Sequence, residues 1–266
     1  MDTAAPKPAP VPEKKRETAE AQACDTQASE VQAAEDGEAV NDIKKHKREN
    51  DMFFGPLERP ALQWLAKTSP SWVMPDLLTA AGVVGSLLCF FGYWLSGQNV
   101  LWLLMVNLGF VINWYGDSLD GTLARYRKIE RPKFGFYIDH TVDAVTEFLT
   151  IIGIGMSPYL DINIAAFALI GYLLMSVHVY VRTAVEGVFR ISYGKFGPTE
   201  MRVIIMTVNT AIILDGLFNS QPWFLDELAW GMKPFDILGI VLAVAMSLVF
   251  LVSSWQHAVR LAREGK

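Results

Sequence analysis

Apolar residues gather in six long runs that begin at about residue 76 and are separated by short polar joins. A bilayer span needs roughly 20 mainly apolar residues, and six segments reach or approach that length. They lie at about 76–96, 99–119, 136–157, 163–185, 201–219 and 235–256. The pattern predicts an all-α integral membrane protein with six transmembrane helices.

Positive charges fall on alternate joins between these runs. They occur at 44–48, at 125–133, at Arg190, Lys195 and Arg202, and at Arg260, Arg263 and Lys266. The opposite joins, 96–99, 157–163 and 218–234, hold one Lys and no Arg. Lys and Arg concentrate on the cytoplasmic side of a membrane. We therefore predict that both termini and the join of spans two and three lie in the cytoplasm.

The chain before the first span divides into two parts. Residues 1–50 are rich in Ala, Pro, Glu, Gln and Lys and contain no aromatic residue, so we expect a disordered polar tail. It lacks the apolar core of a signal peptide. In 51–74, a juxtamembrane amphipathic segment, Leu57, Leu62 and Trp64 stand among charged residues, which favours a short interfacial helix over an ordinary loop.

Four carboxylates lie at the inner ends of the second and third spans. They are Asp117, Asp120, Asp139 and Asp143, and Asn113 and Glu147 extend the two polar stripes. Steps of three and four place side chains on one face of a helix, and a short join lets the two helices lie face to face. Charges within a span are costly and usually face a polar cavity. We expect all four carboxylates to converge.

Protons, arginines or metal ions could neutralise such a cluster. Ligands that are all oxygen suit Mg²⁺ or Mn²⁺, and two such ions can clamp the oxygens of a phosphoryl transfer. Gly121, Gly135 and Ala124 leave space beside the acids, and Arg125 can meet a phosphate. Charges at a helix end would explain Asp117 alone as well. Four acids at this spacing indicate a pyrophosphate site.

The spacing of these residues resembles the signature of the CDP-alcohol phosphotransferases, also called CDP-alcohol phosphatidyltransferases. The matching pattern is Asp117-x-x-Asp120-Gly121-x-x-Ala124-Arg125, nine residues, then Gly135-x-x-x-Asp139-x-x-x-Asp143. The resemblance covers about residues 57–260. It makes 75–260 a six-helix transmembrane catalytic domain, with 261–266 as a cytoplasmic C-terminal end.

The resemblance implies that an alcohol attacks the β-phosphorus of a CDP-alcohol while CMP leaves. All four aspartates would be ligands of two ions, Mg²⁺ or Mn²⁺, and Asp143 would also take the proton of the acceptor hydroxyl. The small residues and Arg125 would contact the CDP moiety. The implied partners are CDP-alcohol and lipid substrates in a membrane, with no nucleic acid, and a homodimer is expected from relatives.

Two further stretches resemble family features less specifically. The "PDLLT" stretch, 75–79, resembles the entry to the first helix near the nucleotide, so Asp76 and Thr79 are CDP-binding candidates. Asp76 as a simple helix cap is the alternative. The "GPTEMR" stretch, 197–202, resembles the Gly-Pro-Thr-Glu of choline and ethanolamine phosphotransferases, although Thr199 could instead cap the fifth span.

The acceptor pocket has two candidate residues, Arg182 and Glu200. Arg182 would suit an anionic acceptor, but pairing with Glu186 at a step of four is the simpler alternative. The leading function is transfer of a phosphatidyl group from CDP-diacylglycerol to a small alcohol. The runner-up passes phosphocholine or phosphoethanolamine from a soluble CDP-alcohol to diacylglycerol. A cation or proton transporter is disfavoured, because the acids gather near one membrane face beside a basic join.

Overall fold

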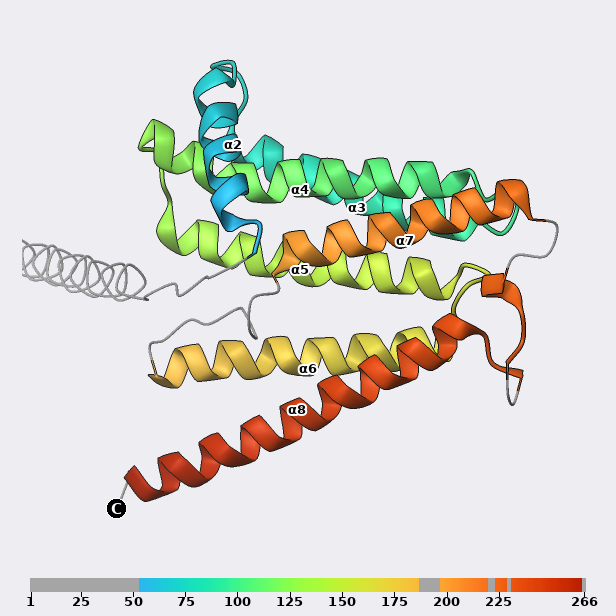
Figure 1. Cartoon of the computed structure of the whole chain (residues 1–266). Coiled ribbons are helices and arrows are strands. Elements are labelled where there is room, and N and C mark those ends of the chain that lie inside the picture. Colours follow the sequence, from blue (N-terminus) through green and yellow to red (C-terminus); the bar gives the residue numbers. More distant parts are fainter. Residues whose placement is uncertain (1–52, 187–196, 220–222, 229–230, 265–266) are drawn as a thin grey trace, which may run out of the picture. The chain divides into compact units, whose positions relative to one another are not determined.

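A computed structural model describes residues 53–186, 197–219, 223–228 and 231–264, and the regular structure in these ranges is helical (Figure 1). The elements are α2 (Gly55–Thr68), α3 (Pro75–Leu95), α4 (Trp102–Arg127), α5 (Pro132–Gly155), α6 (Ile162–Glu186), α7 (Pro198–Phe218), η1 (Trp223–Leu225) and α8 (Pro234–Glu264). The predicted all-α class is confirmed for this part of the chain. The predicted tail, 1–50, and the basic residues Arg190, Lys195 and Lys266 lie outside the described residues.

Four helices are long and apolar enough to cross a bilayer. They are Pro75–Leu95, Ile162–Val185, Pro198–Phe218 and Pro234–Arg263. α4 and α5, with 26 and 24 residues, also have the length of a span. They are less apolar because they carry the acidic residues. Four of the six predicted spans are therefore supported, and they make the chain a multi-pass membrane protein. The two remaining predicted spans correspond to α4 and α5, which carry the four aspartates.

α4 extends past the predicted end of the second span at residue 119. The helix runs to Arg127 and stops where Lys128 adopts a left-handed conformation, with φ 57°. Because α5 begins at Pro132, the join predicted at 125–133 shrinks to 128–131. Hydropathy marks where lipid ends, whereas good helix formers such as Leu, Ala and Arg continue the helix into the polar zone. The whole first half of the acidic signature therefore lies on one continuous helix.

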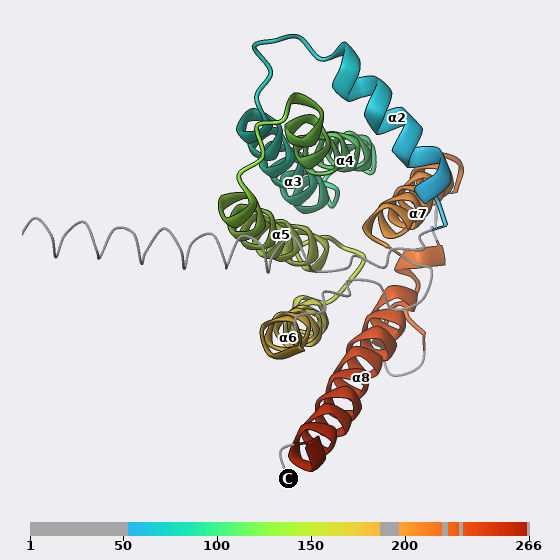
Figure 2. The ribbon, with the colours of Figure 1, turned by 90° about the vertical axis from the view of Figure 1, so that its left-hand side faces the viewer.

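α2 forms within the predicted juxtamembrane segment and is amphipathic. Leu62 and Ala66 are buried against α4, where they join the cluster that contains Leu119 and Leu123. Trp64, on the other side of α2, is largely exposed. Figure 2 shows α2 lying across α4 and α7. One face of α2 therefore packs on the bundle, and the opposite face exposes the apolar side chain of Trp64.

α3 and α4 pack with their backbones in contact. A Cβ added at Gly85 would lie 2.5 Å from the Asn113 amide nitrogen, and one at Gly116 would lie 2.4 Å from the Leu78 carbonyl oxygen. Only glycine tolerates such an approach. The close contact also lets the Asn113 side chain donate from Nδ2 to the Gly82 carbonyl oxygen at 3.1 Å.

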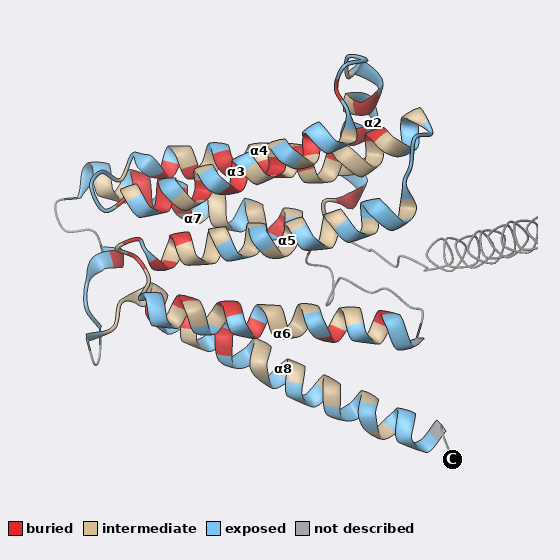
Figure 3. Cartoon of the chain, turned by 180° about the vertical axis from the view of Figure 1, so that it is seen from behind, coloured by how far each residue is buried: buried red, intermediate tan, exposed pale blue. Residues whose placement is uncertain are grey.

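The remaining helices pack on this central pair. Gly153 of α5 lies against the backbone of α3, since a Cβ there would meet Phe90 Cα at 2.8 Å. A buried polar chain ties α7 to the pair: the Tyr93 hydroxyl donates to Asn209 Oδ1 at 3.2 Å, and Asn209 Nδ2 donates to Asn107 Oδ1 at 3.0 Å. α6 contacts α5 and α8. Figure 3 shows that buried residues concentrate on the facing sides of α3 and α4, while most of α8 is exposed.

Replacing Gly116 by Ala is predicted to lower the thermal unfolding midpoint of the detergent-solubilised protein. The added methyl group would press on the backbone of α3, and overpacking of this kind costs about 1–3 kcal/mol. Gly135→Ala is the matched control, because a Cβ there meets no atom within 4 Å. Equal midpoints for the two variants would contradict the close helix contact.

Candidate active site

A cleft lies between the start of α3, the second half of α4 and the first half of α5. Its lining is mainly polar and comes from all three helices: Thr79, Gly82, Asn113, Asp117, Asp120, Asp139, Val142, Asp143 and Thr146. All four predicted carboxylates belong to this lining. The prediction that they converge between two neighbouring helices is therefore met by the geometry.

Three of the carboxylates form a tight group. One oxygen from each of Asp117, Asp139 and Asp143 lies within 4.8 Å of the other two, and all three residues are partly buried. Such a group repels itself unless a cation shares it. The donors are all carboxylate oxygens, which fit a hard divalent cation such as Mg²⁺ or Mn²⁺. The cluster can therefore hold a divalent metal ion.

Asp120 faces the same cleft but has different partners. Its Oδ2 accepts a hydrogen bond of 2.6 Å from the Thr79 hydroxyl on α3, and its Oδ1 accepts one from the Gly121 amide. Thr79 thus reaches the acidic site from the helix that the sequence linked to the nucleotide. The side chain of Asp120 is oriented by α3, whereas the other three acids face one another. The metal-binding role of each aspartate stays a prediction.

The small residues of the signature lie beside open or flexible neighbours. A Cβ at Gly121 would meet Arg125 Nη1 at 3.3 Å, so the guanidinium of Arg125 lies back over Gly121 and also donates to Thr122. Nothing lies within 4 Å of a Cβ at Gly135. Ala124 is half-buried on the same helix. The space beside Gly135 is open and that beside Gly121 is taken by the end of the Arg125 side chain, and the CDP-binding role of these residues stays a prediction.

Asp76 lies apart from the cleft lining, in contrast to Thr79. Its exposed carboxylate pairs with Arg131, in the join between α4 and α5. The alternative that Asp76 caps the helix is wrong, because the N-cap of α3 is Met74 and no side chain makes a cap hydrogen bond. Asp76 sits in the first turn instead, where it ties the start of α3 to the join.

The two acceptor-pocket candidates also lie outside the cleft lining. Glu200 is buried at the start of α7, and its two oxygens accept hydrogen bonds from the amides of Phe54, at 2.8 Å, and Gly197, at 2.9 Å. The N-cap of α7 is Gly197, so the alternative cap Thr199 is wrong. Arg182 is half-buried on α6. Neither position tests the predicted acceptor role.

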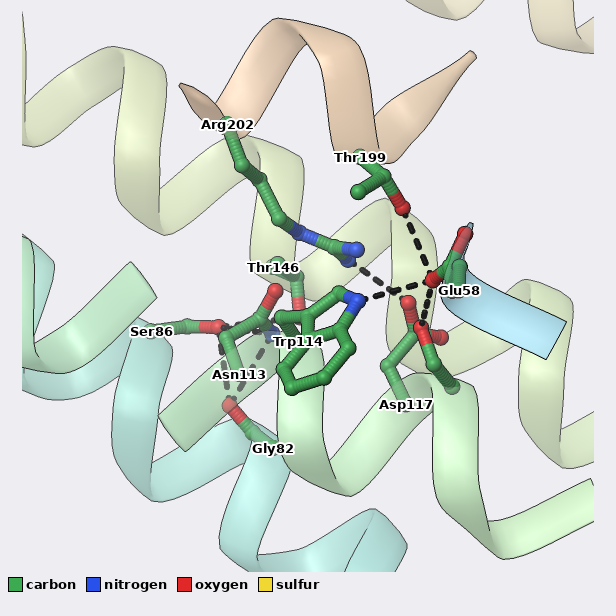
Figure 4. A network of polar contacts seen from close by, with 10 residues as sticks. Glu58, Gly82, Ser86, Asn113, Trp114, Asp117, Thr146, Thr199 and Arg202 are labelled. Atoms are coloured by element: carbon green, nitrogen blue, oxygen red, sulfur yellow. Dashed lines mark hydrogen bonds and ion pairs between the residues drawn. The ribbon is translucent and has the colours of Figure 1, made fainter. Parts of the chain in front are cut away.

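Two residues that the sequence did not single out lie at the acidic site, where Arg202 contacts it directly and Glu58 contacts its neighbours. Arg202 on α7 places Nη2 2.6 Å from Asp117 Oδ2, and Glu58 on α2 accepts a hydrogen bond of 2.7 Å from Trp114 Nε1 (Figure 4). In the sequence, Arg202 stood among the charges that set orientation and at the end of the "GPTEMR" stretch, without a predicted role at the acidic site. Pairing between helices this far apart in the chain leaves no periodic signal.

A cleft lined by carboxylates beside apolar helices is suited to a membrane enzyme that handles charged groups. A family model described as CDP-alcohol phosphatidyltransferase matches residues 72–263. The chain belongs to this family. The predicted class, a transferase of substituted phosphate groups in phospholipid synthesis, is thereby confirmed.

Similar proteins come from distant organisms. The archaetidylinositol phosphate synthase of Pyrococcus horikoshii is 27% identical over 168 residues, which cover 62% of this chain and 81% of that protein. Cholinephosphotransferase 1 of Gallus gallus is 24% identical, covering 72% of this chain and 58% of its own length, and that of Danio rerio is 26% identical, covering 67% and 48%. The chain thus spans about half the length of these cholinephosphotransferases.

A solved structure also resembles this fold. It is the phosphatidylinositol phosphate synthase of Mycobacterium tuberculosis in its apo form, with 20% sequence identity and a TM-score of 0.48. The match covers 74% of this chain and 95% of that one.

Neutralising Asp139 is predicted to change how Mn²⁺ affects unfolding. Wild-type protein should unfold at a higher temperature when Mn²⁺ is added, since a ligand that binds only the folded state stabilises it. Asp139→Asn should unfold higher than wild type without metal, because repulsion is relieved, and should lose most of the Mn²⁺ effect. Asp226→Asn, an exposed site outside the cleft lining, is the control. An undiminished Mn²⁺ effect in Asp139→Asn would contradict the cluster as a metal site.

Proposed function

We propose that this chain transfers a phosphatidyl group from CDP-diacylglycerol to a small polar alcohol, with release of CMP. The meeting of Asp117, Asp139 and Asp143 in one cleft, with oxygens within 4.8 Å of one another, carries the proposal. The pyrophosphate of a CDP-alcohol is the anionic part of the donor, and it would require a counter-charge at such a site. Membership of the family supports the reaction class.

The acidic residues would divide the work as follows. Two Mg²⁺ or Mn²⁺ ions held by Asp117, Asp120, Asp139 and Asp143 would neutralise the pyrophosphate and the leaving phosphate. Thr79 would keep Asp120 oriented through its 2.6 Å hydrogen bond.

Asp143 would act as the general base. It accepts the proton of the acceptor hydroxyl as that oxygen forms a bond to the β-phosphorus, and the bond from the β-phosphorus to CMP breaks. The hydroxyl alone is a weak nucleophile at neutral pH, and loss of its proton during attack removes that obstacle.

The nucleotide would lie at the open end of the cleft. Arg125 lies over Gly121 and donates to Thr122 at an exposed position, so it is free to turn towards a phosphate. Gly121, Ala124 and Gly135 would let the CDP moiety approach the backbone, and Thr79 and Asp76 would lie near it. Arg182 would contact an anionic acceptor in the acceptor pocket. Glu200 would act there only indirectly, because both its oxygens hold backbone amides.

The proposed topology has six spans, with α4 and α5 as the second and third and both termini in the cytoplasm. The acidic residues of α4 lie between the middle of the helix and the end that carries Arg125 and Arg127, and this end leads into the join 128–131. Positive charge on this join supports a cytoplasmic site, where soluble CMP could leave. The exposed Leu57 and Trp64 support a position of α2 in the membrane interface. The homodimer expected from relatives stays a prediction.

The donor could also be a soluble CDP-alcohol such as CDP-choline, with diacylglycerol as the acceptor. The match to cholinephosphotransferases and the "GPTE" stretch favour this second candidate. The match to the archaeal synthase covers 81% of that protein, whereas the match to the cholinephosphotransferase of Gallus gallus covers 58%. The archaeal protein, which is matched over more of its own length, is named as the synthase of a lipid phosphate joined to inositol, a small polar alcohol. For this reason we propose the CDP-diacylglycerol reaction as the first candidate.

Purified protein in lipid nanodiscs is predicted to release CMP from CDP-diacylglycerol only with Mg²⁺ or Mn²⁺ and an alcohol acceptor. CDP-choline with diacylglycerol is offered separately, and a panel of acceptors is tested with the first donor. Asp143→Asn should lower the rate by about 10²–10⁴-fold, the usual contribution of a general base, while Asp226→Asn keeps it.

The possible results separate the candidates. CMP formed only from CDP-choline would establish the second candidate in place of the first. No metal-dependent CMP from either donor would contradict the proposed reaction. A nearly normal rate in Asp143→Asn would remove Asp143 as the base while leaving the reaction class standing.

A further inference from the structure

Arg202 forms an ion pair with Asp117, one of the three carboxylates that form the acidic group. Its guanidinium donates from Nη2 to Asp117 Oδ2 at 2.6 Å, and the two side chains are only 13% and 26% exposed. Arg202 is thus a counter-charge supplied by the protein itself to the place where a divalent cation would bind.

The first turn of α7 is held in place by Glu58 of α2. Glu58 Oε1 accepts three hydrogen bonds, from Trp114 Nε1 at 2.7 Å, from the Ser118 hydroxyl at 3.2 Å and from the Thr199 hydroxyl at 3.0 Å. The first two donors flank Asp117 on α4, and the third lies one turn before Arg202 on α7. Figure 4 shows Glu58 between Trp114 and Thr199, with Asp117 and Arg202 next to it. One oxygen therefore joins three helices beside the ion pair.

α2 itself has little freedom to move away. The Phe54 amide at its start donates to Glu200 on α7 at 2.8 Å. Beyond its end, Arg127 of α4 donates to the backbone carbonyls of Ser69 and Pro70, at 3.1 and 2.7 Å. Both ends of α2 are tied down, so Glu58 is a fixed point against which the start of α7 is positioned.

A carboxylate that is paired with a guanidinium gives less to a metal ion. Binding of a divalent cation at Asp117 would have to displace Arg202 or tolerate its repulsion, and both reduce affinity. We propose that Glu58 is a positioning residue that holds Arg202 on Asp117 as a built-in competitor of the divalent cation. The proposal rests on the metal site of the proposed function. It gives the interfacial helix a direct effect on how readily that site is loaded.

Mn²⁺ binding to the full chain in nanodiscs, followed by the electron paramagnetic resonance signal of free Mn²⁺, tests this proposal without any turnover. Arg202→Gln should bind Mn²⁺ about fivefold more tightly than wild type, the size set by a partly buried ion pair. Arg202→Lys keeps the charge and should stay near the wild-type affinity. Arg131→Gln removes an equal charge from an exposed pair with Asp76 and should leave the affinity unchanged.

Glu58→Ala should tighten Mn²⁺ binding in the same direction, and combining it with Arg202→Gln should add nothing further. Glu58→Gln retains an acceptor oxygen for the three donors and should restore wild-type affinity. Thr199→Val cuts the link to α7 alone and serves if Glu58→Ala fails to fold. A merely structural role for Glu58 would weaken Mn²⁺ binding, and that weakening would persist in the double variant.

The outcomes distinguish this proposal from the proposed function. Unchanged or weaker Mn²⁺ binding in Arg202→Gln would overturn the competition while leaving the metal site in place. Tighter binding in Arg202→Gln with no change in Glu58→Ala and Thr199→Val would overturn the positioning role of Glu58. No Mn²⁺ binding by wild type and by Arg202→Gln alike would overturn both the metal site and this proposal.

Discussion

The backbone contact between α3 and α4 determines where the functional groups of this bundle can lie. With Gly85 and Gly116 at the crossing, the two helices approach to a distance at which no other residue fits. At that distance Thr79 reaches Asp120, and Asn113 reaches the carbonyl oxygen of Gly82. A bulkier interface would move α3 outwards and break both hydrogen bonds. Gly109 belongs to the same contact, since a Cβ there would lie 2.6 Å from the Gly85 carbonyl oxygen. The α3–α4 side of the acidic cleft therefore depends on glycines along this crossing.

α5 is attached to α3 and α4 by a chain of hydrogen bonds close to the acidic residues. Asn113 Nδ2 also donates to the Ser86 hydroxyl, and Ser86 donates to the Thr146 hydroxyl on α5, both at 3.1 Å. In an apolar environment such satisfied polar contacts are specific, because an unpaired group would be costly. They set the register of α5 against α3 and α4, which brings Asp139 and Asp143 level with Asp117. Packing between apolar surfaces alone would not define that register so closely.

The concentrated negative charge of the acidic cleft lowers the stability of the fold, and it also suits the cleft to binding cations. Three carboxylates with oxygens within 4.8 Å of one another destabilise the fold unless a cation is close. Arg202 supplies one positive charge from α7, and a divalent ion would supply more. The same crowding that requires a cation would let the site neutralise a pyrophosphate in a membrane, where few other charges are available.

Periodicity and composition predicted the helices and the acidic face correctly, because both depend on local spacing. The steps of three and four between Asp117 and Asp120 and between Asp139 and Asp143 are properties of single helices. The end of α4 was misplaced, since hydropathy follows lipid contact rather than helix geometry. The contacts of Glu58 and Arg202 were missed because they join segments about 60 to 140 residues apart. Such pairings depend on how the helices assemble, which a single sequence does not display.

The most direct test of the acidic cleft as a two-metal CDP site is a structure of the wild-type chain with Mn²⁺ and CDP-diacylglycerol, in which anomalous scattering locates the metal. We expect two Mn²⁺ peaks among the four aspartates, with the pyrophosphate of the nucleotide bound against them and the cytidine towards Thr79 and Gly121. A nucleotide bound outside the cleft, or the absence of Mn²⁺ at these carboxylates, would contradict it.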